Sequence, residues 1–379
     1  AQGRITSAAN GTIPASAGTI TATASGAIAN GDTVIVKTNG DVEAVTKTVS
    51  SLSSPTRIST GSTHFDTNQV RFVHATFIPS KKMIVLAYRG NFTGANGMGL
   101  RIGTIDGDSI TWASSGYMFL SATEEYIRTA WSETDDAGVV FSQGSNGVYA
   151  AKFTISGTGT SAEPIFQQIF DVETGGSSDY LSLAYDSNSN RFLAFYIRNN
   201  GNTLKARVIQ INGNNLSQGT ATSISTAMPN YTAAAFDPDT NQVIIGYGTN
   251  SGGAKVRAIS INPSNNSFTQ GSEATLVNTN ALGDLVAIYD TTNDKAVFAY
   301  WDSNNNVCAA AVVSVSGSSV SVGTPVTFNT TDGTHALTFD SEAGKILFSY
   351  MDGGNSNYLR GRVGTVSGTS ISFNTEDFI

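Results

Sequence analysis

An internal repeat with a period of about 50 to 54 residues is the feature that most constrains how this 379-residue chain can fold. In each of the six copies an apolar run ends on or near a tyrosine, a polar loop follows, and an alternating run stops at a two-residue turn. The marker tyrosines are Tyr88, Tyr196, Tyr247, Tyr300 and Tyr350, and a degraded copy near Phe141 fills the gap. A unit of this length is typical of a four-stranded β-propeller blade.

The hydrophobic pattern predicts the strands within one copy. Apolar runs such as 297–300 and 346–348 are too short for a helix and suit a second strand that is covered on both faces. The third strand alternates, as in 359–365, and stops at pairs such as Ser316-Gly317 that favour tight hairpins. Polar loops such as 237–241 are typical of turns between the first two strands. Each copy is therefore predicted to form an antiparallel meander.

A lone sheet of this kind leaves its apolar faces open, whereas sheets arranged radially cover one another. The sequence predicts an all-β fold, a six-bladed β-propeller of four-stranded antiparallel blades with a small N-terminal β-module. Residues 1–48 form the N-terminal segment and residues 49–379 the propeller, with repeats near 60–121, 122–173, 174–225, 226–278, 279–329 and 330–379. A β-solenoid is the structural alternative, but its repeats are usually much shorter than about 50 residues.

Two segments compete for the role of the last outer strand. Residues 370–379 are predicted to be the outer strand of the sixth copy. Residues 51–59 also resemble an outer strand and would latch the ring if they paired with the last blade.

Composition limits the partners of the chain. A net charge of -8 and a pI near 4.9 argue against nucleic acid, which needs clustered Lys and Arg. The single cysteine, Cys308, excludes an intrachain disulfide and is predicted to be a buried small residue. No run is long enough for a membrane span. No signal peptide is visible, and a start at Ala1 fits either loss of an initiator Met or earlier removal of a leader.

The first 45 residues differ in composition from the repeats. Residues 8–24 are almost all Ala, Gly, Ser, Thr and Ile, which is too poor in large apolar side chains to form a core alone. Asn39-Gly40 joins two alternating runs and is predicted to be the turn of a hairpin. We expect this segment to order against a partner.

The motif F-D-x-x-x-x-K-[hydrophobic]3-x-Y-x-D is matched by residues 339–352 and approximately by residues 289–302. This motif and the stretch 25–45 resemble structural proteins of tailed phages, especially marine ones. The resemblance implies a non-enzymatic virion protein, either a tail-associated or fibre-like appendage that presents the propeller to a host-surface glycan, or a capsid decoration protein. It also implies an extracellular virion location, attachment to other virion proteins through residues 1–45, and a homo-oligomer within the assembly. The coiled coil, β-helical shaft and chaperone-like carboxy terminus of many complete fibres are missing.

A secreted or virion-borne carbohydrate-active hydrolase is the alternative function. Glycosidases need two carboxylates roughly 5 to 10 Å apart, and Asp302 and Asp352 stand at equivalent places two residues after a marker tyrosine. Each of them can equally cap a turn in its own loop. No S-x-D-x-G-x-x-W box is present, and none of His64, His74 and His335 lies in a serine-nucleophile context.

The sequence predicts no metal and no cofactor. No H-x-x-x-H or C-x-x-C pair offers zinc ligands. Asp237, Asp239 and Asn241 alternate as in calcium loops, but the glycine at the sixth position and the distal glutamate of an EF-hand are missing. We interpret this loop as a turn.

Ligand binding is predicted in the loops that diverge most between copies, since variable loops on a constant scaffold are where recognition tends to lie. Amides, carboxylates and occasional aromatic planes suit a saccharide, although the same residues also make ordinary loops. The candidate ligand-binding residues are Arg89, Phe92, Arg198, Tyr231, Trp301, Asp302, Asp352 and Tyr358. The virion hypothesis predicts that residues 1–45 pack against another chain, and the hydrolase hypothesis predicts two carboxylates in a central pocket.

Overall fold

The structure is a computed structural model of the full chain. It describes residues 34–37, 40–44 and 70–378, apart from short gaps at 93–94, 108, 122–125, 176–177, 199–202, 228, 250–252, 279–281, 332–334, 355 and 376. The chain divides into two units, Ala1–Ser53 and Ser54–Ile379, which are described separately.

In the first unit the described residues form one antiparallel hairpin, as predicted. Strand β1 (Val34–Val36) pairs with β2 (Val42–Ala44). The connecting turn includes Gly40 at φ 87°, a left-handed conformation that glycine adopts without a steric penalty. Residues 8–24 and 51–59 lie outside the described residues, so the attachment and latch predictions that rest on them stay predictions.

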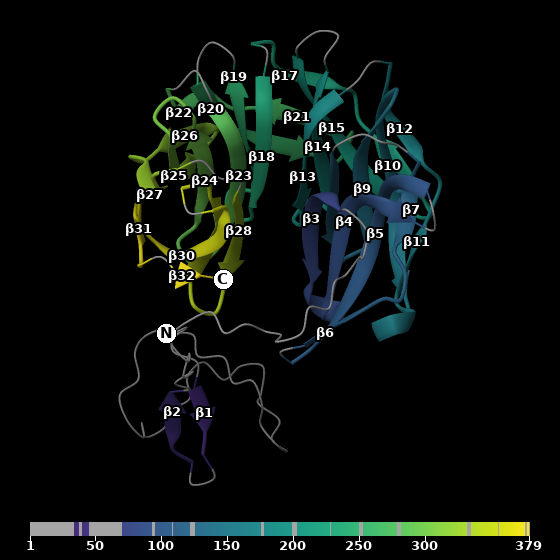
Figure 1. The fold of residues 1–379 in the computed structure, drawn as a ribbon, viewed down its shortest axis with the longest axis horizontal. Helices are drawn as coiled ribbons and strands as arrows, with labels where there is room; N and C mark the ends of the chain where they lie inside the picture. The colour runs from purple at the N-terminus through teal and green to yellow at the C-terminus, as the bar shows by residue number, and fades with distance from the viewer. Residues whose placement is uncertain are drawn as a thin grey trace, which may run out of the picture. The chain divides into compact units, whose positions relative to one another are not determined.

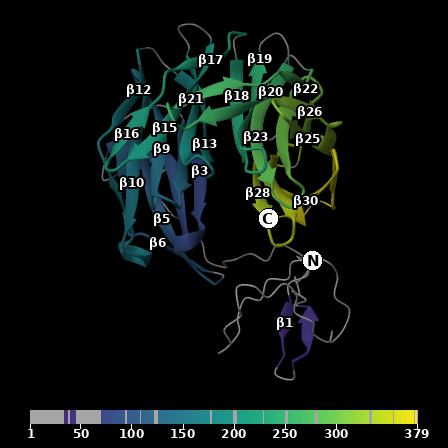
Figure 2. The ribbon, with the colours of Figure 1, turned by 180° about the vertical axis from the view of Figure 1, so that it is seen from behind.

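The second unit is a six-bladed β-propeller, which confirms the predicted fold (Figures 1 and 2). In every blade an inner strand, a second strand and a third strand follow in antiparallel order, and the third strand carries an outer strand broken into two short pieces. The strands of blades 1 to 3 are β3 (Arg71–Ile78), β4 (Met83–Phe92), β5 (Ala95–Asp106), β6 (Ser109–Trp112), β7 (Tyr117–Leu120); β8 (Ile127–Ser132), β9 (Ala137–Gly144), β10 (Gly147–Ser156), β11 (Glu163–Phe166), β12 (Phe170–Thr174); β13 (Ser178–Asp186), β14 (Arg191–Arg198), β15 (Thr203–Asn212), β16 (Asn215–Gln218) and β17 (Thr222–Ser225).

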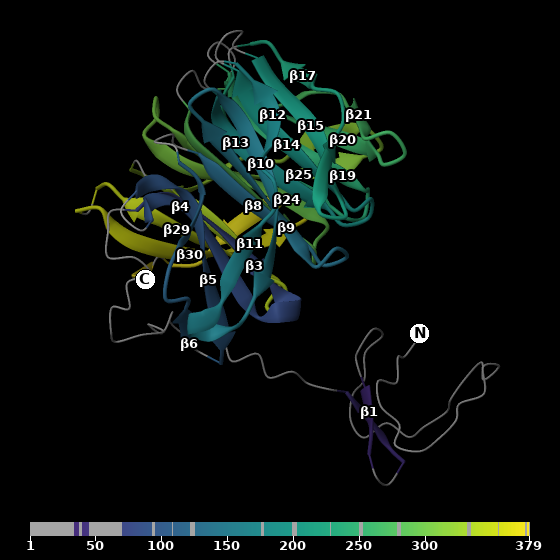
Figure 3. The same ribbon diagram turned by 90° about the vertical axis from the view of Figure 1, so that its right-hand side faces the viewer.

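Blades 4 to 6 repeat the same order, and β31 and β32 supply the outer strand of blade 6, as predicted for residues 370–379. Their strands are β18 (Pro229–Asp237), β19 (Gln242–Thr249), β20 (Gly253–Asn262), β21 (Ser267–Gln270), β22 (Ala274–Val277); β23 (Leu282–Asp290), β24 (Lys295–Asp302), β25 (Val307–Ser316), β26 (Ser319–Val322), β27 (Val326–Asn329); β28 (His335–Asp340), β29 (Lys345–Asp352), β30 (Tyr358–Ser367), β31 (Ser370–Phe373) and β32 (Asp377–Phe378). Figure 3 turns the molecule so that blades 1 and 2, in blue to teal, face the viewer.

Helix is almost absent from the described part of the chain. It consists of two three-residue 3-10 turns, η1 (Pro79–Lys81) and η2 (Gly159–Ser161). No helix there is long and apolar enough to cross a membrane.

The polar loops between first and second strands are turns held by an aspartate. The Oδ1 of Asp237 accepts the backbone N–H groups of Asp239 and Thr240 at 3.0 and 3.2 Å. Asp186 and Asp290 make the same pair of bonds in blades 3 and 5. The interpretation of residues 237–241 as a turn is therefore confirmed.

The second strands supply the cores between neighbouring blades. The marker side chains are all buried, namely Tyr88, Phe141, Tyr196, Tyr247, Tyr300 and Tyr350. Between blades 4 and 5 the ring of Phe298 lies so close to β19 that a Cβ on Gly246 would come within 2.6 Å of it. Cys308 is buried in the core between blades 5 and 6, as predicted.

The junction between blades 6 and 1 differs from the other five. Each of the five cores joins consecutive blades, and within the described residues none joins blade 6 to blade 1. Large exposed apolar side chains gather on these two blades, including Phe77 on β3 and Leu347 and Leu359 on blade 6. Sequence patterning did not reveal this difference, because the sixth copy is as apolar as the others.

The packing account makes a stability prediction. Phe298→Ala should lower the free energy of unfolding by about 3–5 kcal/mol, since it removes a fully buried ring and leaves a cavity. Phe77→Ala, at a ring that is 55% exposed, should change it by less than about 0.5 kcal/mol. Urea denaturation of both variants measures the difference, and equal losses would contradict the assignment of the core.

Candidate functional site

Four aromatic rings from four consecutive blades form an arc near the propeller axis. The rings of Phe72 and Tyr126 have centroids 5.6 Å apart, those of Tyr126 and Tyr180 5.3 Å, and those of Tyr180 and Tyr231 4.6 Å. They come from β3, from the residue before β8, from β13 and from β18. Together with Arg128 and residues 283–285 they line a cavity of about 250 Å³.

Three of these aromatic residues have an unusual backbone. Phe72, Tyr180 and Tyr231 have φ values of 54°, 51° and 44°, a left-handed conformation that is rare for bulky side chains. Each lies where the pairing of the inner strand with the second strand shifts register. The other non-glycine residues with positive φ are Asp, Asn, Ser and Lys. A conformation that costs on the order of 1–3 kcal/mol, repeated in three blades, indicates a functional constraint.

Arg128, on the inner strand β8 of blade 2, faces the same cavity. Among the described residues it forms no ion pair, and its one hydrogen bond runs from Nη1 to the carbonyl oxygen of Ile127 at 2.8 Å. Burial lowers the pKa of its guanidinium, while Tyr126 and the negative charge of Asp284 act in the opposite direction. A partly buried cation that forms no ion pair with a described carboxylate is poised to bind an anion.

Asp284 supplies the carboxylate of the cavity and is held in place by two backbone groups. Its Oδ1 accepts the N–H of Leu285 at 2.8 Å, and its Oδ2 accepts the N–H of His335 at 3.2 Å. The Nδ1 of His335 lies 3.8 Å from the same oxygen. The side chain of Asp284 keeps 22% of its surface exposed, so its carboxylate can still meet a ligand or a water.

The pKa values near the cavity reflect its low polarity. Burial, followed by Tyr180 and Asp284, raises the pKa of Tyr231 to about 12, so its phenol stays a hydrogen-bond donor at neutral pH. Burial, followed by the positive charge of Arg128, lowers the pKa of His74 to about 3. His74 is therefore neutral above about pH 4 and contacts Thr129 across the blade junction, with Nδ1 3.4 Å from Oγ1.

Blade 5 shapes the cavity differently from blades 1, 3 and 4. Where those blades place an aromatic ring before the marker tyrosine, β23 has Asp284, and Gly283 precedes it at the register shift. The indole of Trp301, from β24, packs against this glycine, and a Cβ there would lie 1.8 Å from the ring. Any larger residue at 283 would displace Trp301.

Of the residues predicted to bind ligand, Tyr231 lines the cavity and Trp301 supports it through Gly283. Phe92 is buried, with its ring 5.0 Å from that of Tyr88. Asp302 is also buried and accepts the N–H groups of Asn304 and Asn305, so it caps a turn.

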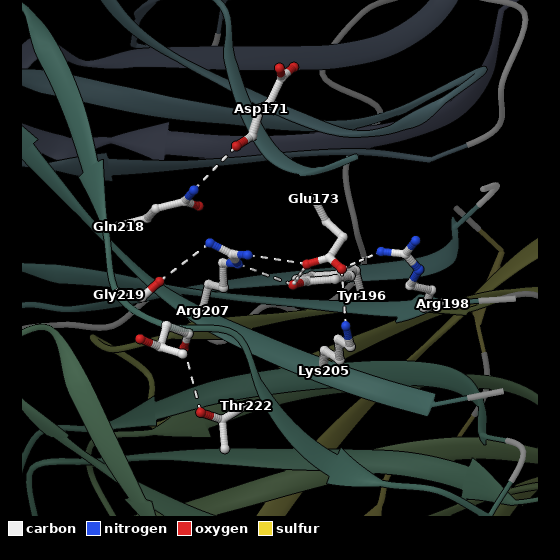
Figure 4. Close-up of polar contacts among 10 residues, drawn as sticks. Asp171, Glu173, Tyr196, Arg198, Lys205, Arg207, Gln218, Gly219 and Thr222 are labelled. Atoms are coloured by element: carbon white, nitrogen blue, oxygen red, sulfur yellow. Dashed lines mark hydrogen bonds and ion pairs between the residues drawn. The ribbon is translucent and has the colours of Figure 1, made fainter. Parts of the chain in front are cut away.

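The other predicted residues do not line this cavity. Arg89 is on β4, opposite Arg71. Arg198 forms an ion pair with Glu173, which also pairs with Lys205 and Arg207 (Figure 4). Asp352 accepts hydrogen bonds from Thr331 and the Gly354 N–H and lines a separate cleft between blades 5 and 6. Tyr358 is 55% exposed at the start of β30. Asp302 and Asp352 line no common cavity among the described residues.

Sequence reasoning missed Phe72, Tyr126, Arg128, Tyr180 and Asp284. A signal was present: Phe72, Tyr180 and Tyr231 each precede a marker tyrosine by the same spacing, from 72 to 88, 180 to 196 and 231 to 247. Asp284 stands at that spacing before Tyr300. This second periodicity precedes the marker tyrosine, whereas the predicted ligand-binding loops follow it.

The described residues contain no group of three or more His, Cys, Asp or Glu that could hold a metal ion. The axial cavity is lined by the Phe72 ring, the phenols of Tyr126, Tyr180 and Tyr231, the Arg128 guanidinium and the Asp284 carboxylate.

Comparisons with known proteins place the fold. Neither protein-family models nor curated proteins give a match. Among solved structures, the periplasmic gluconolactonase of Pseudomonas aeruginosa has a TM-score of 0.60 at 11% identity, over 81% of this chain and 85% of its own. A protein of Bacteroides fragilis, provisionally named a 6-phosphogluconolactonase, has a TM-score of 0.58 at 10% identity, over 80% and 83%. The Aleuria aurantia lectin, in complex with alpha-methyl-L-fucoside, has a TM-score of 0.50 at 14% identity, over 82% and 95%.

These findings correct two predictions. The prediction of a non-enzymatic phage virion protein is wrong, and so is the prediction that the protein is not an enzyme, because propellers similar to this chain are named as gluconolactonases. The physical reason is that the repeat follows from how the blades pack against one another. Propellers of different function share this packing, so the repeat does not indicate function. At identities of 10 to 14% the likeness establishes the fold, and the chain is similar to sugar-lactone and sugar-binding propellers in that respect.

Proposed function

We propose that the protein hydrolyses a sugar lactone to the corresponding sugar acid in the axial cavity. The observation that carries this proposal is Arg128, which forms no ion pair within the described part of the chain and faces an aromatic-walled cavity that also contains the Asp284 carboxylate. The names of the gluconolactonase neighbours support the choice of substrate class.

The size and lining of the cavity suit a single sugar ring. A volume of about 250 Å³ is close to the lower end of ligand pockets. The rings of Phe72, Tyr180 and Tyr231 offer flat apolar faces for the C–H side of a sugar, while the phenols supply hydrogen bonds to its hydroxyls. The four contiguous rings would orient the edge of the sugar ring toward Arg128 and Asp284.

Lactone hydrolysis creates negative charge at the carbonyl and then a carboxylate, and Arg128 can stabilise both. Asp284 can accept a proton from the attacking water, whose oxygen forms the new bond to the carbonyl carbon. The ring ester bond then breaks, and its oxygen takes a proton from the Tyr231 phenol to become a hydroxyl. The proton held by Asp284 returns to Tyr231, and the new carboxylic acid loses its own proton. The products are a carboxylate and a released proton, so acid release follows the reaction.

The proposal predicts a specific loss of turnover. The unmodified chain should accelerate acid release from D-glucono-δ-lactone above its spontaneous rate, measured in a pH-stat. Arg128→Gln should lower kcat by roughly 10²–10³-fold, since it removes the group that meets the developing oxyanion. Asp284→Asn should cost about 10²-fold or more through loss of the base.

The control for this measurement is Lys255→Gln, a lysine on the third strand of blade 4 that does not line the axial cavity. It should leave turnover unchanged. Absence of turnover, or equal turnover in Arg128→Gln and the control, would contradict the proposed reaction.

The aromatic arc makes a separate binding prediction. Tyr231→Gly should weaken binding of D-gluconate, measured by calorimetry, because it removes a stacking face. Its thermal unfolding should shift little, since glycine is favoured at a φ of 44° and offsets the lost ring contact. Tyr358→Ala, at an exposed tyrosine outside the cavity, is the matched control. Normal gluconate binding by Tyr231→Gly would contradict a role of the aromatic arc in ligand binding.

A further inference from the structure

Each of the first five blades places one side chain at the same point of its inner strand. Six residues before the last residue of that strand stand Phe72, Tyr126, Tyr180, Tyr231 and Asp284, in blade order. All five line the axial cavity. Four aromatic rings and one carboxylate therefore follow one another around the propeller axis.

The spacing of the rings sets the width of the space that they surround. Neighbouring ring centroids are 5.6, 5.3 and 4.6 Å apart, and neighbouring rings are tilted by 45 to 49° to one another. Six blades repeat at steps of about 60°, and the corners of a hexagon lie as far from its centre as from each other. The axis therefore passes about 5 Å from each centroid, within the reach of about 6 Å for a cation–π contact.

Asp284 adds a full negative charge to this ring of side chains. Its carboxylate is fixed by the N–H groups of Leu285 and His335, at 2.8 and 3.2 Å, and keeps 22% of its side chain exposed. A quaternary ammonium has no N–H to donate, so it is bound by aromatic faces and by opposite charge. Four rings and a carboxylate around one axis supply both.

Arg128 gives the cavity a second, positive pole. It follows Tyr126 by two residues, so both side chains leave the strand on the same side, with Arg128 about 6–7 Å further along. Among the described residues it forms no ion pair. A simple cation among the rings would be repelled by this guanidinium, whereas a ligand with its own carboxylate would be held at both ends.

We propose that the axial cavity binds a small trimethylammonium carboxylate of the betaine class, with its ammonium among the four rings and Asp284 and its carboxylate on Arg128. The cavity volume of about 250 Å³, near the lower end of ligand pockets, suits a ligand of this size. A betaine has no ester bond to break. This is a binding activity beyond the proposed hydrolysis and does not depend on it.

The test is calorimetric titration of the full chain with glycine betaine and with matched probes that each lack one feature. The anion 3,3-dimethylbutanoate has the same shape and carboxylate, but a neutral carbon replaces the ammonium nitrogen. Choline has the trimethylammonium group without a carboxylate. Glycine betaine should bind roughly tenfold or more tightly than either probe, because only it satisfies the rings, Asp284 and Arg128 together.

Variants separate the two poles. Arg128→Gln should weaken betaine binding roughly tenfold or more and leave choline binding equal or tighter, since it removes a positive charge. Tyr126→Leu should weaken betaine binding roughly three- to tenfold, because leucine keeps an apolar side chain without a π face. Tyr126→Phe keeps the ring and should lose less than Tyr126→Leu. Tyr358→Ala, at an exposed tyrosine outside the cavity, is the control.

Absence of betaine binding to the unmodified chain would overturn the proposal. Binding of 3,3-dimethylbutanoate or choline as tight as that of glycine betaine would also overturn it, as would equal affinity of Tyr126→Leu and Tyr126→Phe. The comparison of ligands uses the unmodified chain, so it stands even where a variant fails to fold. Lactone turnover is measured separately in the pH-stat, so failure of either proposal leaves the other standing.

Discussion

Packing of apolar second strands across blade interfaces is the interaction on which the rest of the structure depends. The side chains of Tyr247 and Phe298 are wholly buried between the sheets of consecutive blades. Burial of large rings supplies about 25 cal/mol per Å² of apolar surface, and the chain has no disulfide to assist it. Since each blade is covered by its neighbours, the scaffold can tolerate unfavourable backbone elsewhere.

The inner strands contain such unfavourable backbone conformations. Phe72, Tyr180 and Tyr231 adopt left-handed backbone angles inside register shifts, which direct their rings toward one another around the axis. Arg128 and Asp284 face the same space, so apolar faces and opposite charges meet in one cavity. The ion pairs around Glu173 involve β12, β14 and β15 and lie outside this cavity.

Sequence periodicity predicted the fold well because each blade repeats the same burial pattern. The marker tyrosines, the aspartate-held turns and the outer strand of blade 6 all follow from residue types at fixed spacing. The site was predicted poorly. Asp302, chosen for its place after a tyrosine, caps a turn, whereas Arg128 and Asp284 are brought together by ring geometry. Aromatic residues with a left-handed backbone have no sequence signature beyond their common spacing. That spacing indicates a shared cavity only once the blades are known to be arranged around an axis.

The central claim is that the axial cavity recognises a sugar acid and the lactone from which it forms. A crystal structure of the protein with bound D-gluconate tests it most directly. The account predicts the sugar carbon chain against the rings of Tyr180 and Tyr231, with the carboxylate on Arg128 and a hydroxyl on Asp284. Gluconate bound elsewhere with an empty axial cavity, or with its carboxylate turned away from Arg128, would contradict the claim.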